Sequence, residues 1–196
     1  MEISQIFADQ LDLYASIPMK YCVASVLKIE PLHEGLGGLS MTEERLGTPY
    51  LKDYDASETP LRWSKQFDIS QWGIFLLQKD NLPVAGAAVA RNTPLVNMLE
   101  NRKDLAVLWD IRVHPDWQRK GLGTRIFRHA ASWAKQLGCT QMKIETQNVN
   151  VPACRFYIKM GCELGMIHRF GYAAIPEAAQ DAMLFWYLDL SDQKIK

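Results

Sequence analysis

The stretch DWQRKGLGTRIF, residues 116–127, decides the fold of this 196-residue chain. Gly121 and Gly123 stand one residue apart after two basic residues, and a long amphipathic segment follows them. Glycines let a backbone approach an anion closely, and the first N–H groups of a helix point toward it with the positive end of the helix dipole. The stretch therefore predicts a phosphate-binding loop at the start of a helix.

Three kinds of phosphate-binding loop have glycine-rich patterns that can be compared with this stretch. A Walker loop, GxxxxGK[ST], does not fit because Lys120 precedes Gly121. The dinucleotide fingerprint GxGxxG does not fit because Ile126 takes the third glycine position and the unit comes late in the chain. The pattern Q/R-x-x-G-x-G, which holds a pyrophosphate on successive backbone amides, fits residues 118–123 at every specified position. A glycine-rich turn without a ligand is the remaining alternative.

The segments on either side of the loop predict alternating strands and helices. Residues 105–115 form a strand that Pro115 ends, and a helix follows over residues 121–137. The apolar face expected for this helix is made of Leu122, Ile126, Ala130, Trp133 and Leu137. Residues 141–147 predict another strand, and residues 151–161 a short helix. Such alternation is typical of an α/β domain.

The remaining segments predict a sheet of several strands. Residues 20–31 form a strand, and residues 72–92 a hairpin that turns at residues 80–83. Residues 32–68 are expected to be irregular, with a short helix at residues 40–47 capped by Ser40 or Thr42. Residues 93–104 predict a polar loop. Two further strands are expected within residues 163–172 and 181–190.

Composition limits the classes of function. The chain is 48 % hydrophobic and 22 % charged, which is typical of a globular protein, and we expect one domain over residues 1–196. The four cysteines form no CxxC pair and the histidines have no partner at ligand spacing, so we expect free thiols and no metal. The N-terminus lacks the basic and apolar regions of a signal peptide, and no apolar run is long enough to span a membrane. We therefore expect a cytoplasmic protein.

The charges are unevenly distributed although the net charge is zero. Residues 1–110 carry 15 acidic and 10 basic side chains, and residues 111–196 carry 7 and 12. A basic second half suits an anionic ligand, and an acidic first half suits a cationic one. The basic residues form no stripe with aromatic residues between them, so nucleic acid is not an expected partner.

Two longer stretches resemble the GNAT (Gcn5-related) N-acetyltransferase superfamily. They are residues 108–138, which contain the loop, and residues 145–162, in which Asn150, Ala153 and Tyr157 have the family's N-x-x-A-x-x-x-Y spacing. Residues 49–55 and 182–190 are also similar to one branch, the streptothricin acetyltransferases. The resemblance implies an α/β fold with a mixed, splayed central sheet of about seven strands flanked by helices.

The resemblance also implies a reaction and its cosubstrate. It implies acetyl transfer from acetyl-CoA to a primary amine by direct attack in a ternary complex. The residues that it implies in acetyl-CoA binding are Ile111, Arg112, Val113, Gln118, Arg119, Lys120, Gly121, Leu122, Gly123, Thr124, Asn150 and Ala153. The backbone of residues 111–113 would pair with the pantetheine arm, and residues 119–124 would hold the pyrophosphate. Many relatives are dimers, so a homodimer is among the implied assemblies.

The resemblance matches Tyr157 to the general acid that protonates the departing thiolate. The alternative is a packed aromatic ring, a role we expect instead for Phe156. Cys154 is the only rival nucleophile near the motif.

The general base is left open between Asp110, Glu145 and water. Strand alternation predicts Asp110 and Arg112 on one face and Trp109 on the other, and Asp110 could equally form an internal salt bridge to Arg112. Glu145 could equally be a structural partner of Lys143 or an arginine.

The acceptor is expected to be a small amine that contacts an acidic wall. Residues 30–68 contain 8 acidic and 4 basic side chains, and in the GNAT fold this region lines the acceptor. The candidate contacts are Glu30, Glu34, Asp53, Asp55 and Glu58. The streptothricin branch implies an aminated antibiotic, and polyamines and protein N-termini are the alternative acceptors. A module that binds acyl-CoA without turnover is the alternative outside the enzymes.

Overall fold

The computed structural model describes residues 1–56 and 58–191. The strands are β1 (Glu2–Ile6), β2 (Lys20–Pro31), β3 (Leu39–Asp53), β4 (Gly73–Lys79), β5 (Leu82–Arg91), β6 (Leu105–Val113), β7 (Gln141–Gln147), β8 (Glu163–His168) and β9 (Met183–Asp189). The α-helices are α1 (Leu11–Ala15), α2 (Trp63–Gln66), α3 (Leu122–Gln136) and α4 (Val151–Lys159).

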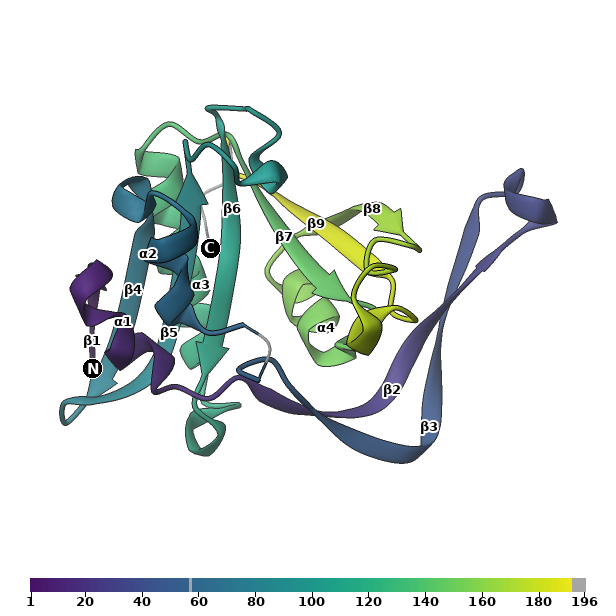
Figure 1. The fold of residues 1–196 in the computed structure, drawn as a ribbon, viewed down its shortest axis with the longest axis horizontal. Helices are drawn as coiled ribbons and strands as arrows, with labels where there is room; N and C mark the ends of the chain where they lie inside the picture. Colours follow the sequence, from purple (N-terminus) through teal and green to yellow (C-terminus); the bar gives the residue numbers. More distant parts are fainter. Residues whose placement is uncertain (57, 192–196) are drawn as a thin grey trace. The chain divides into compact units, whose positions relative to one another are not determined.

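The strand pairing confirms the predicted mixed sheet. Seven strands pair in the order β1-β4-β5-β6-β7-β9-β8, and β2 pairs with β3 in a separate two-stranded sheet (Figure 1). The pairing of β6 with β7 is parallel, whereas β4 and β5, β5 and β6, and β8 and β9 are antiparallel neighbours. The hairpin of β4 and β5 turns at Asp80 and Asn81, which both have positive φ as a two-residue turn requires.

Two compact units divide the chain. Unit 1 contains residues 1–20, residues 53–144 and the chain from residue 188 onward, and unit 2 contains residues 21–52 and 145–187. Both β7 and β9 contribute residues to each unit. The single domain over residues 1–196 stays a prediction.

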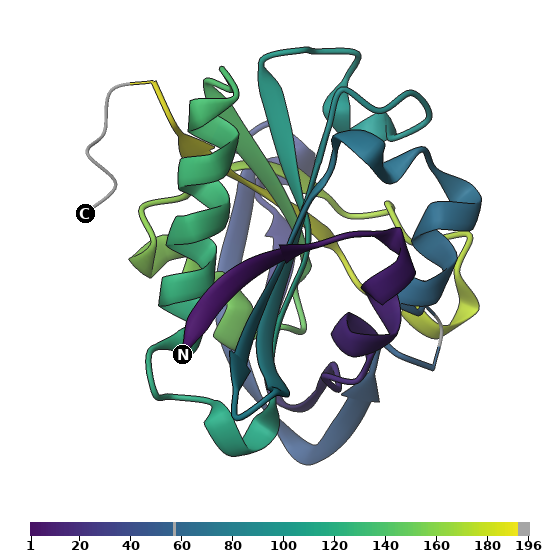
Figure 2. The ribbon, with the colours of Figure 1, turned by 90° about the vertical axis from the view of Figure 1, so that its left-hand side faces the viewer.

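Unit 1 is a sheet covered on both faces. Figure 2 shows α3 along one face of β4, β5 and β6, with α1 and α2 on the opposite side. The α3 face buries Phe75 against Trp133, with the ring centroids 5.6 Å apart. The other face holds a cluster of buried side chains around Tyr14 and Trp63. No helix in the described part of the chain is long and apolar enough to cross a membrane.

Gly86 on β5 leaves room for the Tyr14 ring. A Cβ atom built at Gly86 would lie 2.5 Å from the nearest atom of that ring. Tyr14 has no solvent exposure, so the ring has little room to move away. The close approach places the Tyr14 phenol beside β6 because Gly86 pairs with Arg112 across the sheet.

We expect Gly86→Ala to destabilise the protein by about 1–3 kcal/mol, because the added methyl group overpacks a filled core. Urea unfolding followed by tryptophan fluorescence measures this loss. The matched control is Gly47→Ala in β3, where an added Cβ atom meets nothing within 4 Å. Equal stability of the two variants would show that the Tyr14 ring does not require this glycine.

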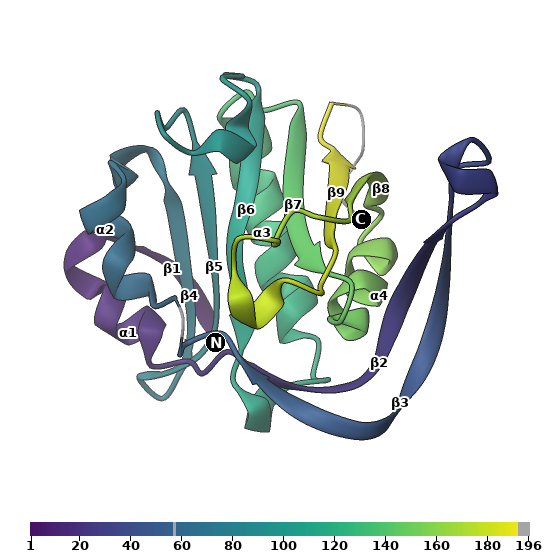
Figure 3. The ribbon, with the colours of Figure 1, turned by 45° about the vertical axis from the view of Figure 1, so that its right-hand side comes forward.

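Unit 2 contains the long hairpin of β2 and β3 and the helix α4 with its neighbouring strands (Figure 3). The hairpin is bound by Asn148, the residue that follows β7, whose side chain donates to the Leu27 carbonyl at 2.9 Å. Asn148 also accepts from the Ala182 backbone N–H at 2.8 Å. One asparagine therefore links the second half of β2 to the segment before β9.

The helix predicted at residues 40–47 is wrong, because these residues belong to strand β3. Local capping signals at Ser40 and Thr42 suggested a helix, but pairing with β2 prevails: Ser40 donates to the Glu30 carbonyl, and Ser25 donates to Glu43. Residues 32–68 are consequently more regular than expected.

The helix α3 differs from the prediction at its end. Leu137 is 43 % exposed, so it is not part of the buried face. Phe127, Ala131 and Ala134 are buried instead, which makes that face wider than the predicted stripe.

Candidate active site

The predicted phosphate loop has the geometry of an open helix start. Gly121 is the N-cap residue of α3 with φ of 81°, a conformation that favours glycine, and Arg119 is also left-handed with φ of 59°. No described side chain caps the first turn of α3, and no acidic residue lies in it. The N–H groups of Leu122, Gly123 and Thr124 therefore point out of the helix end, where an anion is favoured.

One side chain of the loop bonds to β6, and another bonds within the loop. Gln118 donates from Nε2 to the Val113 carbonyl at 3.3 Å, and Lys120 donates from Nζ to the Asp116 carbonyl at 2.8 Å. The Lys120 ammonium also lies 4.7 Å from the centre of the Trp117 ring. Arg119 is exposed and adds positive charge at the rim of the loop.

Strand β6 changes its pairing halfway along its length. Its parallel ladder with β7 covers Leu105 to Leu108, and its antiparallel ladder with β5 continues to Val113. Within these ladders, residues 109–113 are paired along one edge only. An extended ligand can add to such an edge by backbone hydrogen bonds. This one-sided pairing has the splayed form that the resemblance implied.

A β-bulge in β6 overturns the predicted alternation of side chains. Asp110 pairs with Ala88 but Leu108 pairs with Val89, so Trp109 is the extra residue. Trp109 packs against the cluster around Tyr14, with its ring centroid 5.3 Å from that of Phe67. Asp110 binds Tyr14, which belongs to the cluster that Trp109 contacts. Trp109 and Asp110 are adjacent in β6 and yet lie on the same face, so the prediction that they lie on opposite faces is wrong.

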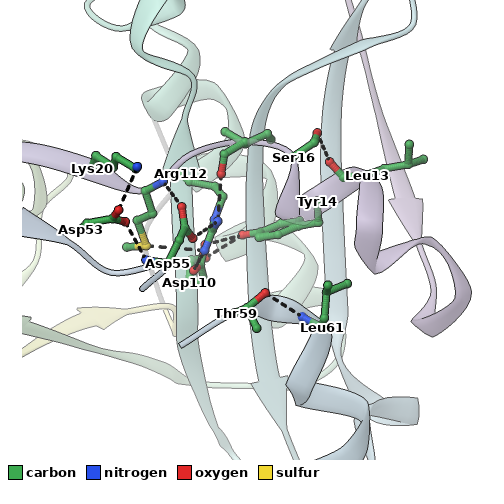
Figure 4. Close-up of polar contacts among 12 residues, drawn as sticks. Leu13, Tyr14, Ser16, Lys20, Asp53, Asp55, Thr59, Leu61, Asp110 and Arg112 are labelled. Atoms are coloured by element: carbon green, nitrogen blue, oxygen red, sulfur yellow. Dashed lines mark hydrogen bonds and ion pairs between the residues drawn. The ribbon is translucent and has the colours of Figure 1, made fainter. Parts of the chain in front are cut away.

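Asp110 forms the internal salt bridge that was its alternative role (Figure 4). Arg112 donates to it twice, from Nε at 2.9 Å and from Nη2 at 2.6 Å, and Tyr14 donates its phenol proton at 2.7 Å. Burial opposes the positive charge of Arg112, but the hydrogen bonds and charge of Asp110 raise the pKa of the guanidinium above its usual value. Burial and then the charge of Asp110 raise the pKa of the Tyr14 phenol.

The acidic candidates for acceptor binding fall into both units. Asp53 and Asp55 belong to unit 1, where Asp53 pairs with Lys20 and Asp55 with Arg112. Glu30 and Glu34 belong to unit 2 and are exposed, and Glu30 pairs with Lys28. Glu58, also in unit 1, donates its backbone N–H to the Tyr54 carbonyl at 3.0 Å.

In unit 2 the motif residues share the start and the buried face of α4. Asn150 is the N-cap, and its side chain accepts from the Ala153 N–H at 3.2 Å. Tyr157 lies seven residues further, two helical turns, so it shares a face with Asn150. Tyr157 is 5 % exposed and Phe156 is only partly buried, so the more buried ring is Tyr157 and not Phe156.

Glu145 on β7 has a partner that the sequence did not suggest. The phenol of Tyr172, a residue of the loop between β8 and β9, donates to Oε1 of Glu145. Lys143, the expected partner, instead pairs with Glu100 at 2.6 Å. Glu145 keeps part of its side chain accessible, whereas Tyr172 is buried and holds it in one orientation.

Cys154 on α4 is not arranged as a nucleophile. It is 2 % exposed, its sulfur lies 3.6 Å from the Thr146 hydroxyl, and burial raises the pKa of its thiol. A thiol in this environment stays protonated at neutral pH and is unreactive.

We expect Cys154→Ala to keep kcat within about twofold of the original protein, because a buried protonated thiol takes no part in direct attack. Steady-state release of free CoA measures the rate. Accumulation of an acetylated enzyme in the original protein, lost in this variant, would contradict the prediction.

Two residues of these networks were not anticipated, Tyr14 and Tyr172. Each lies far along the chain from the carboxylate that it binds, 96 residues for Tyr14 and 27 for Tyr172. Gly86 was the only local signal for Tyr14, because a glycine inside a strand often marks the close approach of another group. In the described part of the chain, no group of three metal-ligating side chains occurs.

An open helix start beside a one-sided strand edge is suited to an extended, phosphate-bearing ligand. The family model for the acetyltransferase (GNAT) family matches residues 40–162, more than half of the chain. The chain belongs to this family, and it is an acetyl-CoA-dependent N-acetyltransferase.

Known proteins similar to the chain include streptothricin and nourseothricin acetyltransferases. Streptothricin acetyltransferase A of Bacillus subtilis (strain 168) is 29 % identical over 151 residues, which covers 77 % of this chain and 80 % of that protein. The crystal structure of nourseothricin acetyltransferase aligns with a TM-score of 0.76 at 16 % identity, over 96 % of this chain and 98 % of the other.

A second solved structure contains the cosubstrate. It is a candidate streptothricin acetyltransferase from Bacillus anthracis str. Ames in complex with acetyl coenzyme A. It aligns with a TM-score of 0.72 at 23 % identity, over 96 % of each chain. At these identities the two solved structures show the fold that they share with this chain.

Proposed function

We propose that the protein acetylates a primary amine of an aminated antibiotic of the streptothricin kind. The observation that carries this proposal is the similarity to streptothricin acetyltransferase A over 77 % of the chain. The acidic character of residues 1–110 supports a cationic acceptor. We propose that the acidic segment 30–68 contacts the acceptor. Glu30 and Glu34 of this segment lie on the hairpin of β2 and β3, which we call the arm.

We propose cosubstrate contacts in each of the two units. Backbone groups of residues 111–113 would pair with the pantetheine arm along the open edge of β6. The pyrophosphate would accept from the N–H groups at the start of α3, with Arg119 adding charge. The Asn150 amide would contact the pantetheine arm through its Nδ2, because its Oδ1 caps α4.

The reaction proposed is direct attack within a ternary complex. The neutral amine nitrogen bonds to the thioester carbonyl carbon, the carbonyl oxygen becomes an oxyanion, and the carbon–sulfur bond then breaks. The Tyr157 phenol gives its proton to the departing thiolate, which leaves as free CoA. The amine nitrogen loses its extra proton to a base, and the product is an amide.

We propose Glu145 as that base. Asp110 is fully engaged by Arg112 and Tyr14, whereas Glu145 is partly accessible and is oriented by Tyr172. A base must reach the amine directly or through one water. In the assay described below, a Glu145→Gln rate close to that of the original protein would assign proton removal to water.

A release assay tests the proposal. Purified protein, acetyl-CoA and one amine at a time are mixed, and free CoA is measured with a thiol dye. The amines are streptothricin, an aminoglycoside, spermidine and a short peptide. We expect turnover with streptothricin at a kcat/KM at least tenfold above the others. A kcat/KM for another amine that equals or exceeds the value for streptothricin would refute streptothricin as the acceptor, and acetyl-CoA binding without any turnover would favour a sensing module. A homodimer stays a prediction, which light scattering of the same sample tests.

A further inference from the structure

Two short segments of unit 1, residues 17–20 and residues 53–55, lie side by side where the chain enters β2 and leaves β3. We call them the neck. The Tyr54 N–H donates to the Met19 carbonyl at 3.1 Å, and Lys20 pairs with Asp53 at 2.8 Å. The Met19 N–H donates to Oδ2 of Asp55 at 2.7 Å. The neck therefore closes the base of the arm formed by β2 and β3.

Arg112 on β6 reaches the neck with its guanidinium (Figure 4). Nη1 donates to the Ile17 carbonyl at 2.9 Å and to Oδ1 of Asp55 at 3.1 Å, and Nη2 contacts the Met19 sulfur at 3.6 Å. With the bonds from Nε and Nη2 to Asp110, these contacts account for all five donors of an arginine. Arg112 therefore holds the neck against β6, and it also fixes the orientation of the Asp110 carboxylate on that strand.

Two ion pairs lie at the neck, and the pair of Arg112 and Asp55 is the one less exposed to solvent. The Arg112 side chain is 2 % exposed and that of Asp55 is 27 % exposed, whereas the Lys20 and Asp53 side chains are 45 % and 30 % exposed. Exposed pairs contribute little because water and salt screen them. The position of the neck on β6 should therefore depend mainly on Asp55.

We propose that Asp55 is a positioning residue for the amine acceptor and acts through Arg112. Residues 111–113 of the same strand, β6, form the edge that would pair with the pantetheine part of acetyl-CoA. The neck leads into the hairpin of β2 and β3, which carries Glu30 and Glu34. Asp55 thus holds the neck, from which the chain enters and leaves the arm, on the strand whose edge would bind the cosubstrate. This inference rests on the proposed function, because it assigns the acceptor contacts to that arm.

The test compares Asp55→Asn with Asp104→Asn, a matched loss of one carboxylate from the exposed Arg102–Asp104 pair of unit 1. For Asp55→Asn we expect the KM for the amine to rise about tenfold, with kcat and the Kd for acetyl-CoA within twofold. Asp104→Asn should leave all three unchanged. Without any amine, amide hydrogen exchange of residues 17–20 and 53–55 should quicken in Asp55→Asn alone.

A double-mutant cycle separates positioning from direct contact with the amine. If Asp55 acts through Arg112, Asp55→Asn should raise the KM little further in an Arg112→Lys background. A full tenfold rise in that background would show that Asp55 binds the amine itself and would overturn the proposal. Unchanged exchange at the neck would also overturn it, even if Arg112→Lys fails to fold. Absence of turnover in the original protein would instead refute the proposed function, since the exchange experiment needs no acceptor.

Discussion

Replacing Tyr157 by phenylalanine is expected to lower kcat by about 100-fold while the Kd for acetyl-CoA stays within twofold. The change removes one hydroxyl and keeps the ring, which packs edge-on against Phe156 at a centroid distance of 5.4 Å. Loss of a general acid typically costs about 10²–10⁴ in rate, because the thiolate must then leave without a proton. Free CoA release gives kcat, and calorimetric titration gives the Kd.

The matched control for this prediction is Tyr187→Phe, which removes a phenol hydroxyl from β9 and should leave kcat unchanged. A Tyr157→Phe enzyme with its full rate would assign protonation of the thiolate to water. A drop in acetyl-CoA affinity with unchanged kcat would make Tyr157 a binding residue instead.

Replacing Arg112 by methionine is expected to lower the free energy of unfolding by about 3–5 kcal/mol. The substitution leaves Asp110, whose side chain is 9 % exposed, as a buried carboxylate without its cation. Removing one partner of a buried ion pair is costly because the remaining charge has lost both water and its counterion. Urea unfolding of the two proteins at neutral pH measures the difference.

Arg102→Met is the control for the arginine prediction, because its pair with Asp104 is exposed and should contribute about 1 kcal/mol or less. Adding Asp110→Asn to Arg112→Met should recover part of the stability, since the buried charge is then gone. A loss no larger than that of Arg102→Met would show that the Asp110–Arg112 pair is not a strong structural element.

The sequence contained enough information for the cosubstrate side of the fold. The helix from Gly121, the strand ended by Pro115 and the hairpin at residues 80–83 all follow from local signals: a positive φ that favours glycine, a missing N–H and a two-residue turn. These signals act within a few residues of one another, so they can be read without knowing the rest of the chain. The helix predicted from residue 151 is also present as α4, which begins at Val151.

Long-range contacts decided the features that the sequence missed. Residues 40–47 had helix-capping signals, but pairing with residues 20–31 made them a strand. The bulge at Trp109 shifted the alternation by one residue, which no propensity scale reports. These outcomes depend on partners distant in the chain, and such pairing energies exceed the small local preferences that a sequence pattern reveals.

The sequence by itself determined the helix start, the motif of α4 and thereby the family, because each is a local pattern of backbone conformation and spacing. Only the tertiary structure decided which groups surround Asp110. Sequence alternation allowed a base or an ion pair, and the fold brought Tyr14 from 96 residues away and Asp55 from the neck to surround Asp110 and Arg112. A carboxylate's function depends on which charges and donors surround it, and that environment is assembled only when distant segments pack together.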